Sequence, residues 1–378
     1  MKYLGIVLFV FLVCLGCQEK KRTENEKVSK QHATVIKYAK GFEINTYKNK
    51  KELIIKAPYL NAKEQFKYNL VTEKEQSITA SKAPNIQTPI HKIVVTSTTH
   101  IPMLELLGVE HTLIGFPNTK YISSVKTRKL IEANAIKEVG LKASLNTEVL
   151  LDLKPDLIVG FSMSKTNKSL NLIEKSGIPV ILNGDWLEET PLGRAEWIKF
   201  FGVLYDKEQK ADSIFNKIEK DYLEAKLVAS TSAGRPSILS GAIMSKDIWN
   251  LPAGESFVAQ FLTDANTDYI WKDSKGKGSL SISFESALDR GKNAPIWIAP
   301  GFFKTKEQML GSNKNYKSFT AFQKNRIYTF TNTVGTTGGA IYFELGPTRP
   351  DLVLKDIIKI AHPELLENYT ATFFDKMD

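Results

Sequence analysis

Two stretches of this chain alternate short apolar runs with amphipathic helical patterns, and this alternation limits the possible folds more than any other feature. The apolar runs are 93–95, 112–115, 157–160 and 179–182 in the first stretch, and 237–240, 295–299 and 326–330 in the second. Short buried strands that alternate with helices form mostly parallel sheets with helices on their faces. The sequence therefore predicts two α/β lobes, an N-terminal lobe over 89–190 and a C-terminal lobe over 229–378.

The segment between the two stretches, 191–228, carries a helical pattern with few breaks. Its apolar residues recur at spacings of three and four, for example Phe215, Ile218 and Tyr222, which is typical of one face of a helix. We expect this segment to form a long helical spine between the lobes. Residues 34–88 instead contain short alternating runs separated by turn residues, which predicts a β-rich N-terminal extension built from hairpins.

The first 17 residues predict a secreted destination. Lys2 precedes an apolar run over 3–16, which is shorter than the ~20 residues of a membrane-spanning helix and has the features of a secretory signal. Leu15-Gly16-Cys17 is similar to a bacterial lipobox, in which Cys17 becomes acylated, although Cys14 stands where such motifs usually carry Leu. The alternative is a plain signal peptide that is cleaved elsewhere. We expect export across the inner membrane and a lipid anchor that faces the periplasm or the cell exterior.

Residues 18–33 are charged and nearly devoid of large apolar side chains, so they are expected to form a flexible tether. Both cysteines precede this tether. A mature chain that starts at Cys17 would have no free thiol, which excludes a cysteine nucleophile, a thiolate metal site and a disulfide framework. The net charge of +10 is spread among acidic residues, and no Lys/Arg block is interleaved with aromatics. Nucleic acid is therefore not an expected partner, and we expect a monomer.

The two lobes contain matching short segments. Each has a polar cap, a glutamate in the first helical turn, a short helix and a buried strand, at 144–159 and at 281–299. Thr147 and Ser283 are the expected N-caps. Glu148 and Glu285 would then lie near helix N-termini, where the helix dipole stabilises a carboxylate.

These segments carry a family resemblance, together with 249–256, 321–330, 347–351 and 362–364. Over roughly residues 88–365 the chain resembles the periplasmic binding proteins of iron-siderophore, haem and cobalamin ABC importers. The resemblance implies a ligand cleft between two lobes joined by a rigid helix, and delivery of the ligand to a permease dimer. It also implies that Glu148 and Glu285 dock onto permease arginines. The alternative is that both are ordinary helix-capping carboxylates.

The ligand of such a protein would lie at loops that follow the carboxyl ends of the strands. These loops are rich in aromatic and hydroxyl side chains, which suits a flat, apolar ligand with polar edges. A ferric siderophore, haem and cobalamin would each fit such a site as the ligand. No resident cofactor is expected. The alternative for each aromatic residue is that its side chain packs in the hydrophobic core and does not face the ligand. The predicted ligand-binding residues are Thr98, His100, Phe116, Phe161, Trp186, Trp249, Phe302, Gly338 and Tyr342.

Three other classes of function are alternatives: a secreted α/β hydrolase, a binder of a bare metal ion, and a structural surface lipoprotein without a ligand. A secreted α/β hydrolase would need a nucleophile elbow, and the chain has no Gly-x-Ser-x-Gly motif. A binder of bare zinc or manganese would need several converging ligands, and the predicted loops offer only His100 with Asp185 or Glu188. We therefore expect a binding protein without catalytic residues and without a metal-ligand set of its own.

Overall fold

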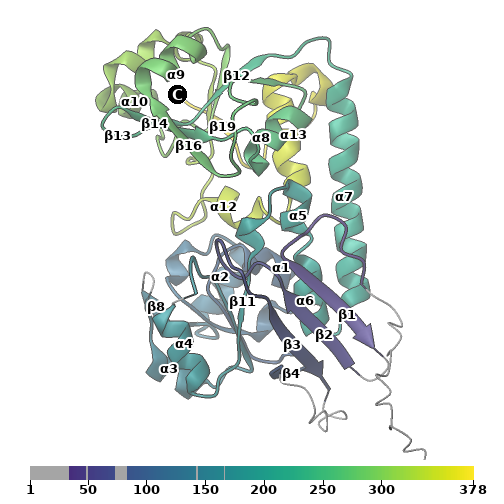
Figure 1. Cartoon of the computed structure of the whole chain (residues 1–378). Coiled ribbons are helices and arrows are strands. Elements are labelled where there is room, and N and C mark those ends of the chain that lie inside the picture. The colour runs from purple at the N-terminus through teal and green to yellow at the C-terminus, as the bar shows by residue number, and fades with distance from the viewer. Residues whose placement is uncertain (1–33, 48–49, 73–82, 142–143, 166) are drawn as a thin grey trace, which may run out of the picture.

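The computed structural model describes residues 34–47, 50–72, 83–141, 144–165 and 167–378. Two α/β lobes lie one above the other in Figure 1, and the long helix α7 (Glu208–Ser230) runs beside both. The predicted fold class is thereby confirmed. Within the described ranges, no helix is both long enough and apolar enough to cross a membrane. The predicted signal, tether and Cys17 lie outside the described residues.

The N-terminal lobe is built on a five-stranded parallel sheet in the order β11-β10-β5-β6-β7. All three residues of β5 are buried because packed side chains cover both faces of the strand, so its sequence is continuously apolar. Polar N-caps begin the helices; the Asn167 side chain, for example, accepts a hydrogen bond from the Leu170 N–H at the start of α4. The elements are β5 (Ile93–Val95), α1 (His100–Leu107), β6 (Leu113–Phe116), α2 (Val125–Glu132), β7 (Lys137–Glu138), β8 (Gly140–Leu141), β9 (Ser144–Leu145), α3 (Thr147–Leu153), β10 (Leu157–Gly160), α4 (Lys168–Lys175) and β11 (Val180–Leu182).

The N-terminal extension forms a separate four-stranded sheet that packs on the N-terminal lobe. Phe42 and Leu53 on this sheet share a hydrophobic core with Trp197 and Phe200 of the linker. The sheet therefore gains its stability from the lobe that it covers. Its strands are β1 (Phe42–Tyr47), β2 (Lys50–Ile55), β3 (Phe66–Val71) and β4 (Asn85–Gln87).

The segment 37–41, which we call the N-terminal strap, is held by two buried carboxylates. Glu196 accepts hydrogen bonds from the backbone N–H groups of residues 37, 38 and 39 at 2.7–3.1 Å. Glu188 accepts hydrogen bonds from the N–H groups of residues 40 and 41 at 2.7–3.0 Å, and from the Trp197 Nε1–H at 3.0 Å. The buried ammonium of Lys199 lies 3.0 Å from Glu196. The strap is thus fastened directly to the linker.

Three helices occupy the segment predicted as the spine: α5 (Pro191–Ala195), α6 (Ile198–Leu204) and α7. Helix α7 has 23 residues and contains neither glycine nor proline. Ala211, Phe215 and Ile218 lie on its buried face at spacings of three and four. It packs against α6 and against the last long helix of the chain, α13 (Pro350–Ala361).

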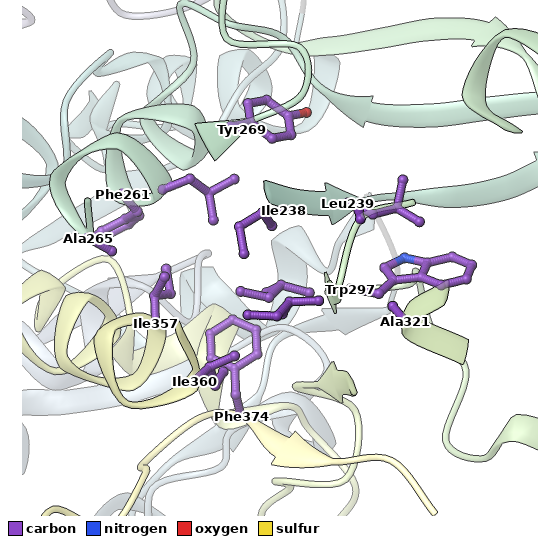
Figure 2. Close-up of a cluster of buried hydrophobic side chains, with 14 of the residues drawn as sticks. Ile238, Leu239, Phe261, Ala265, Tyr269, Trp297, Ala321, Ile357, Ile360 and Phe374 are labelled. Carbon is purple, nitrogen blue, oxygen red and sulfur yellow. The ribbon is translucent and has the colours of Figure 1, made fainter. Parts of the chain in front are cut away.

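The C-terminal lobe has a five-stranded sheet in the order β15-β12-β17-β18-β19, in which only β19 is antiparallel to its neighbour. A smaller antiparallel sheet, β13-β14-β16, lies beside it. Figure 2 shows side chains of β12, α8 and α13 gathered in the core of this lobe, among them Ile238, Phe261 and Ile357. The remaining elements are β12 (Ser237–Ser240), β13 (Ala242–Ser245), β14 (Ile248–Pro252), α8 (Phe257–Asp264), β15 (Asp268–Tyr269), β16 (Ser279–Ser283), α9 (Phe284–Gly291), β17 (Ile296–Ile298), α10 (Lys306–Ser312), α11 (Thr320–Gln323), β18 (Ile327–Thr329), α12 (Ile341–Leu345) and β19 (Asp375–Lys376).

Candidate ligand site and docking carboxylates

Two aromatic side chains lie beyond the strand ends of the N-terminal lobe. Phe161 follows β10 and is 37% exposed, and Trp186 lies in a short 3-10 helix after β11. Their ring centroids are 5.3 Å apart. The Phe161 N–H donates to the Thr96 hydroxyl at 2.8 Å, which fixes the loop after β10 to the loop after β5. We call Phe161 and Trp186 the N-lobe aromatic pair; Phe161 also lines an open cavity of about 440 Å³.

A larger aromatic group lies beyond the strand ends of the C-terminal lobe. It consists of Phe302 after β17, Phe330 after β18, and Tyr342 and Phe343 on α12. Tyr342 stacks on Phe330 at 5.1 Å between centroids, and Phe343 lies 5.0 Å from Phe330 and 6.1 Å from Phe302. Phe302 is 65% exposed. These four residues, the C-lobe aromatic group, offer rigid apolar contact area to a ligand.

Arg194 on α5 lies next to both lobes. Its Nη2 donates to the backbone oxygen of Trp186 at 2.6 Å, and its Nε donates to the backbone oxygen of Glu188 at 3.3 Å. Its guanidinium carbon lies 3.7 Å from the ring centroid of Phe257 on α8. Sequence reasoning missed Arg194, because a single arginine in a helical segment has no local pattern that distinguishes it from a surface residue.

The loop over residues 335–339, which we call the glycine loop and which contains the predicted Gly338, reaches from the C-terminal lobe to the N-terminal lobe. The Thr337 hydroxyl donates to the Lys120 backbone oxygen at 2.7 Å, and the Ser123 hydroxyl donates to the Gly339 backbone oxygen at 2.9 Å. A Cβ on Gly339 would lie 2.5 Å from the Tyr121 oxygen, so only glycine permits this approach. Gly338 has a φ of +89° and no neighbour near its missing Cβ. The positive φ of this turn accounts for a glycine at position 338, without any contact to a ligand.

Two predicted ligand-binding residues, Trp249 and Phe116, are buried rather than exposed to a ligand. Trp249 has no exposed surface; it stacks on Trp297 at 5.3 Å and donates its Nε1–H to the Ser240 backbone oxygen. Phe116 lies in the core of the N-terminal lobe. The prediction that they face the ligand is corrected, since strand ends place alternate side chains in the core.

His100 is also completely buried, with its ring 5.4 Å from that of Phe201, and burial lowers the pKa of its imidazole. It therefore sits in the packed interior rather than at a surface. Thr98, two residues earlier, is half-buried and lies just before α1. Among the described residues, no three His, Cys, Asp or Glu side chains gather closely enough to hold a metal ion.

The two predicted docking carboxylates occupy equivalent positions. Glu148 lies in the first turn of α3 and Glu285 in the first turn of α9, and both are exposed. Ser283 is the N-cap of α9, as predicted, whereas α3 is capped by Asn146 and not by Thr147. The Asn146 side-chain oxygen accepts a hydrogen bond from the Val149 N–H at 3.2 Å. Thr147 is the first residue of the helix and therefore does not occupy the capping position. Figure 1 shows α3 in the lower lobe and α9 in the upper one.

A family model described as periplasmic binding protein matches residues 93–334, which is more than half of the chain. The chain belongs to the periplasmic binding protein family. The matched range begins at β5 and ends just beyond β18, so it spans both lobes and the linker between them.

Two solved structures share the fold of this periplasmic binding protein. One is described as a possible iron-binding (periplasmic solute-binding) protein from Staphylococcus epidermidis, with 19% identity and a TM-score of 0.56 over 73% of this chain and 100% of that chain. The other is described as a periplasmic heme binding protein from Pseudomonas aeruginosa, with 16% identity and a TM-score of 0.58 over 76% of this chain and 98% of that chain.

A relative of this periplasmic binding protein is an uncharacterized lipoprotein of Methanocaldococcus jannaschii. It is 25% identical over a match that covers 99% of this chain and 95% of the relative. A second uncharacterized lipoprotein of that organism is 22% identical over 95% of this chain and 94% of its own length. The first match extends over the N-terminal sheet, so the segment that lies before the family match has a counterpart in that lipoprotein.

Proposed function

We propose that this periplasmic binding protein is the lipid-anchored substrate-binding component of an ABC importer. It captures an iron complex, either a siderophore or haem, or cobalamin between its lobes and delivers it to the permease. The observation that carries this proposal is the presence of two aromatic sets, one at the strand ends of each lobe. Arg194 of the linker helix α5 contacts Trp186 on one side and Phe257 on the other. Flat metal chelates bind through such rigid aromatic surfaces.

The comparisons support the general class of this proposal. Proteins of this family bind small ligands and work with ABC permeases, and solved structures with this fold are described as iron- or haem-binding. The lipoprotein names of the archaeal relatives support the acylation of Cys17. The proposed role consists of capture and delivery, without a catalytic step.

Delivery is proposed to use Glu148 and Glu285. Both are exposed and neither forms an ion pair with the described residues, so their charges are free for a partner. A permease dimer presents two similar basic surfaces, and one carboxylate on each lobe engages both. Once the first contact forms, the second becomes effectively intramolecular. Charge complementarity then sets the orientation of the complex more than its affinity.

The optical spectrum of protein purified from its native host tests the ligand class. A Soret band indicates haem, a corrin spectrum indicates cobalamin, and a charge-transfer band indicates a ferric siderophore. Ligand-free protein is then titrated with haemin, cyanocobalamin and a panel of ferric siderophores, while tryptophan fluorescence and the melting temperature are recorded. If the native protein has no such spectrum and all titrations leave both signals unchanged, the proposed ligand class is wrong.

A further inference from the structure

A small cavity lies where α5 meets α8, α12 and α13. Its volume is about 170 Å³. An engineered cavity of about 150 Å³ holds benzene, so this one has room for a single six-membered ring. Most of its lining is apolar, from the residues Pro191, Phe257, Phe261, Phe343, Pro347 and Val353.

Two polar side chains also line this cavity. The guanidinium of Arg194 uses Nη2 and Nε for backbone oxygens, and its Nη1 has no acceptor among the described residues. The Tyr342 hydroxyl likewise has no hydrogen-bond partner there. Burial raises the pKa of Tyr342 to about 12, and the nearby Arg194 charge opposes that rise. A cation and a phenol therefore lie close together at one apolar cavity.

No carboxylate of the described residues forms an ion pair with Arg194, whose direct partners are two neutral carbonyls and the ring of Phe257. The negative charges of Asp185 and Glu188 act on the guanidinium without contacting it. A largely buried cation that lacks a contacting counter-charge is costly. A carboxylate in the cavity would supply that charge, because guanidinium groups bind carboxylates through strong, charge-assisted hydrogen bonds.

We propose that Arg194 and Tyr342 bind a carboxylate that is carried on a ring-sized apolar group. This inference rests on the proposed function, because the group is assigned as one arm of the ligand that lies between the lobes. Phe343 supports the assignment: it lines the cavity and also contacts the exposed Phe302 of the C-lobe aromatic group. The protein then selects chelates with an anionic arm over neutral chelates of the same shape.

The first test uses benzoate and benzyl alcohol as probes, with isothermal titration calorimetry of the detergent-solubilised mature protein at pH 7. Both probes fill the cavity with a ring, and only benzoate carries charge. We expect benzoate to bind at least tenfold more tightly, since a hydrogen bond to a charged group is worth about 1.5–3 kcal/mol. Equal binding of the two probes, or no binding of benzoate, overturns the inference.

Amino-acid substitutions test whether Arg194 and Tyr342 account for the tighter binding of benzoate. Arg194→Gln should weaken benzoate binding about tenfold or more and leave benzyl alcohol unchanged. Tyr342→Phe, which keeps the stack on Phe330, should weaken benzoate binding severalfold and serves if Arg194→Gln does not fold. Arg290→Gln is the matched control, because Arg290 also donates to a backbone oxygen and lies over a ring, that of Trp271, outside the cavity. An equal loss with Arg290→Gln refutes the site.

Competition tests whether the carboxylate belongs to the transported ligand. Benzoate should displace whichever of haemin or a carboxylate-bearing ferric siderophore binds to the protein. Simultaneous binding of benzoate and chelate contradicts the assignment to a ligand arm. If benzoate binds as expected and all chelates fail, the proposed function is wrong while the carboxylate site stands.

Discussion

The carboxylate of Glu344 accepts a hydrogen bond of 2.6 Å from the backbone N–H of Ser123. Glu344 lies on α12 of the C-terminal part of the chain, and Ser123 lies just before α2 of the N-terminal lobe. The Ser124 N–H adds a second bond at 2.9 Å. Glu105 lies close by and accepts from the hydroxyls of Ser124 and Thr127. The bond therefore joins the two lobes beside the glycine loop.

This bond predicts a pH-dependent stability. Burial raises the pKa of Glu344 to about 7, and the negative charge of Glu105 adds to the rise, while the Ser123 and Ser124 N–H groups oppose it. The folded state then holds a proton that the unfolded state releases above its ordinary pKa of about 4.3. The free energy of unfolding should fall by about 3 kcal/mol between pH 4.5 and 7.5 because of this group.

Urea denaturation across that pH range measures the effect. Glu344→Gln should remove the part of the decline that this group contributes, because the amide does not ionise, while the buried carboxyls of Glu188 and Asp356, whose pKa values are also raised, keep their own contributions. Glu364→Gln, at an exposed surface position, is the control and should follow the wild type. Parallel pH profiles for wild type and Glu344→Gln would contradict the prediction.

The N-terminal strap makes Glu196 a strong stability determinant. Glu196→Ala would leave the N–H groups of residues 37–39 without their acceptor and the buried Lys199 without its nearest carboxylate. Breaking a buried ion pair of this kind costs about 3–5 kcal/mol. Glu189→Ala is the comparison, since its ion pairs with Lys40 and Lys277 are partly exposed and worth about 0–1 kcal/mol. Equal losses in urea denaturation would show that the strap does not depend on Glu196.

Trp186 and Trp249 should differ in what their removal changes. Trp186→Ala should weaken binding of the cognate chelate by about 1–3 kcal/mol with little effect on folding, because its ring pairs with the half-exposed Phe161. Trp249→Ala should instead destabilise the protein by about 3–5 kcal/mol, because its fully buried ring leaves a cavity. Fluorescence titration and thermal melts of both variants separate the two effects. A binding loss confined to Trp249→Ala would reverse this assignment.

Charge reversal tests the docking carboxylates. The double variant Glu148→Arg with Glu285→Arg should fold and bind ligand normally, while uptake through the importer falls steeply. Each single variant should be milder, and docking should weaken with added salt. Ligand binding and uptake are measured on the same preparations. Normal uptake by the double variant would return both residues to the role of helix-capping carboxylates.

The anchor prediction rests on Cys17, which precedes the described residues. The mature protein should partition into membranes or detergent, because acyl chains contribute about 0.8 kcal/mol per buried methylene. Cys17→Ser should release or mislocalise it. Recovery of all wild-type protein in the soluble fraction would disprove lipidation.

The architecture was predictable from the sequence because burial on both faces of a parallel strand leaves a continuous apolar run, as in β5 and β10. The helix-terminal positions of Glu148 and Glu285 were predictable for a related reason, since polar caps precede them. The exact cap of α3 was missed by one residue, because Asn146 and Thr147 are both good capping residues.

The site was harder to predict, because exposure at a strand end depends on tertiary packing. Phe161 and Trp249 were both predicted from their places in loops, yet Phe161 is half-exposed and Trp249 is fully buried against Trp297 and Phe319. No local sequence pattern marks Arg194 or Glu344 as important, since their contacts are with residues of other elements. The contact of Glu344 with Ser123 spans 221 residues.

The strap also decides how a mechanical load would travel through this protein. Its five backbone N–H groups end on Glu188 and Glu196, next to α5 and α6, and not on either central sheet. A pull applied at residue 37 would therefore load Glu196 and Glu188 in turn before it reached β1, so these two carboxylates set the force at which the strap peels away.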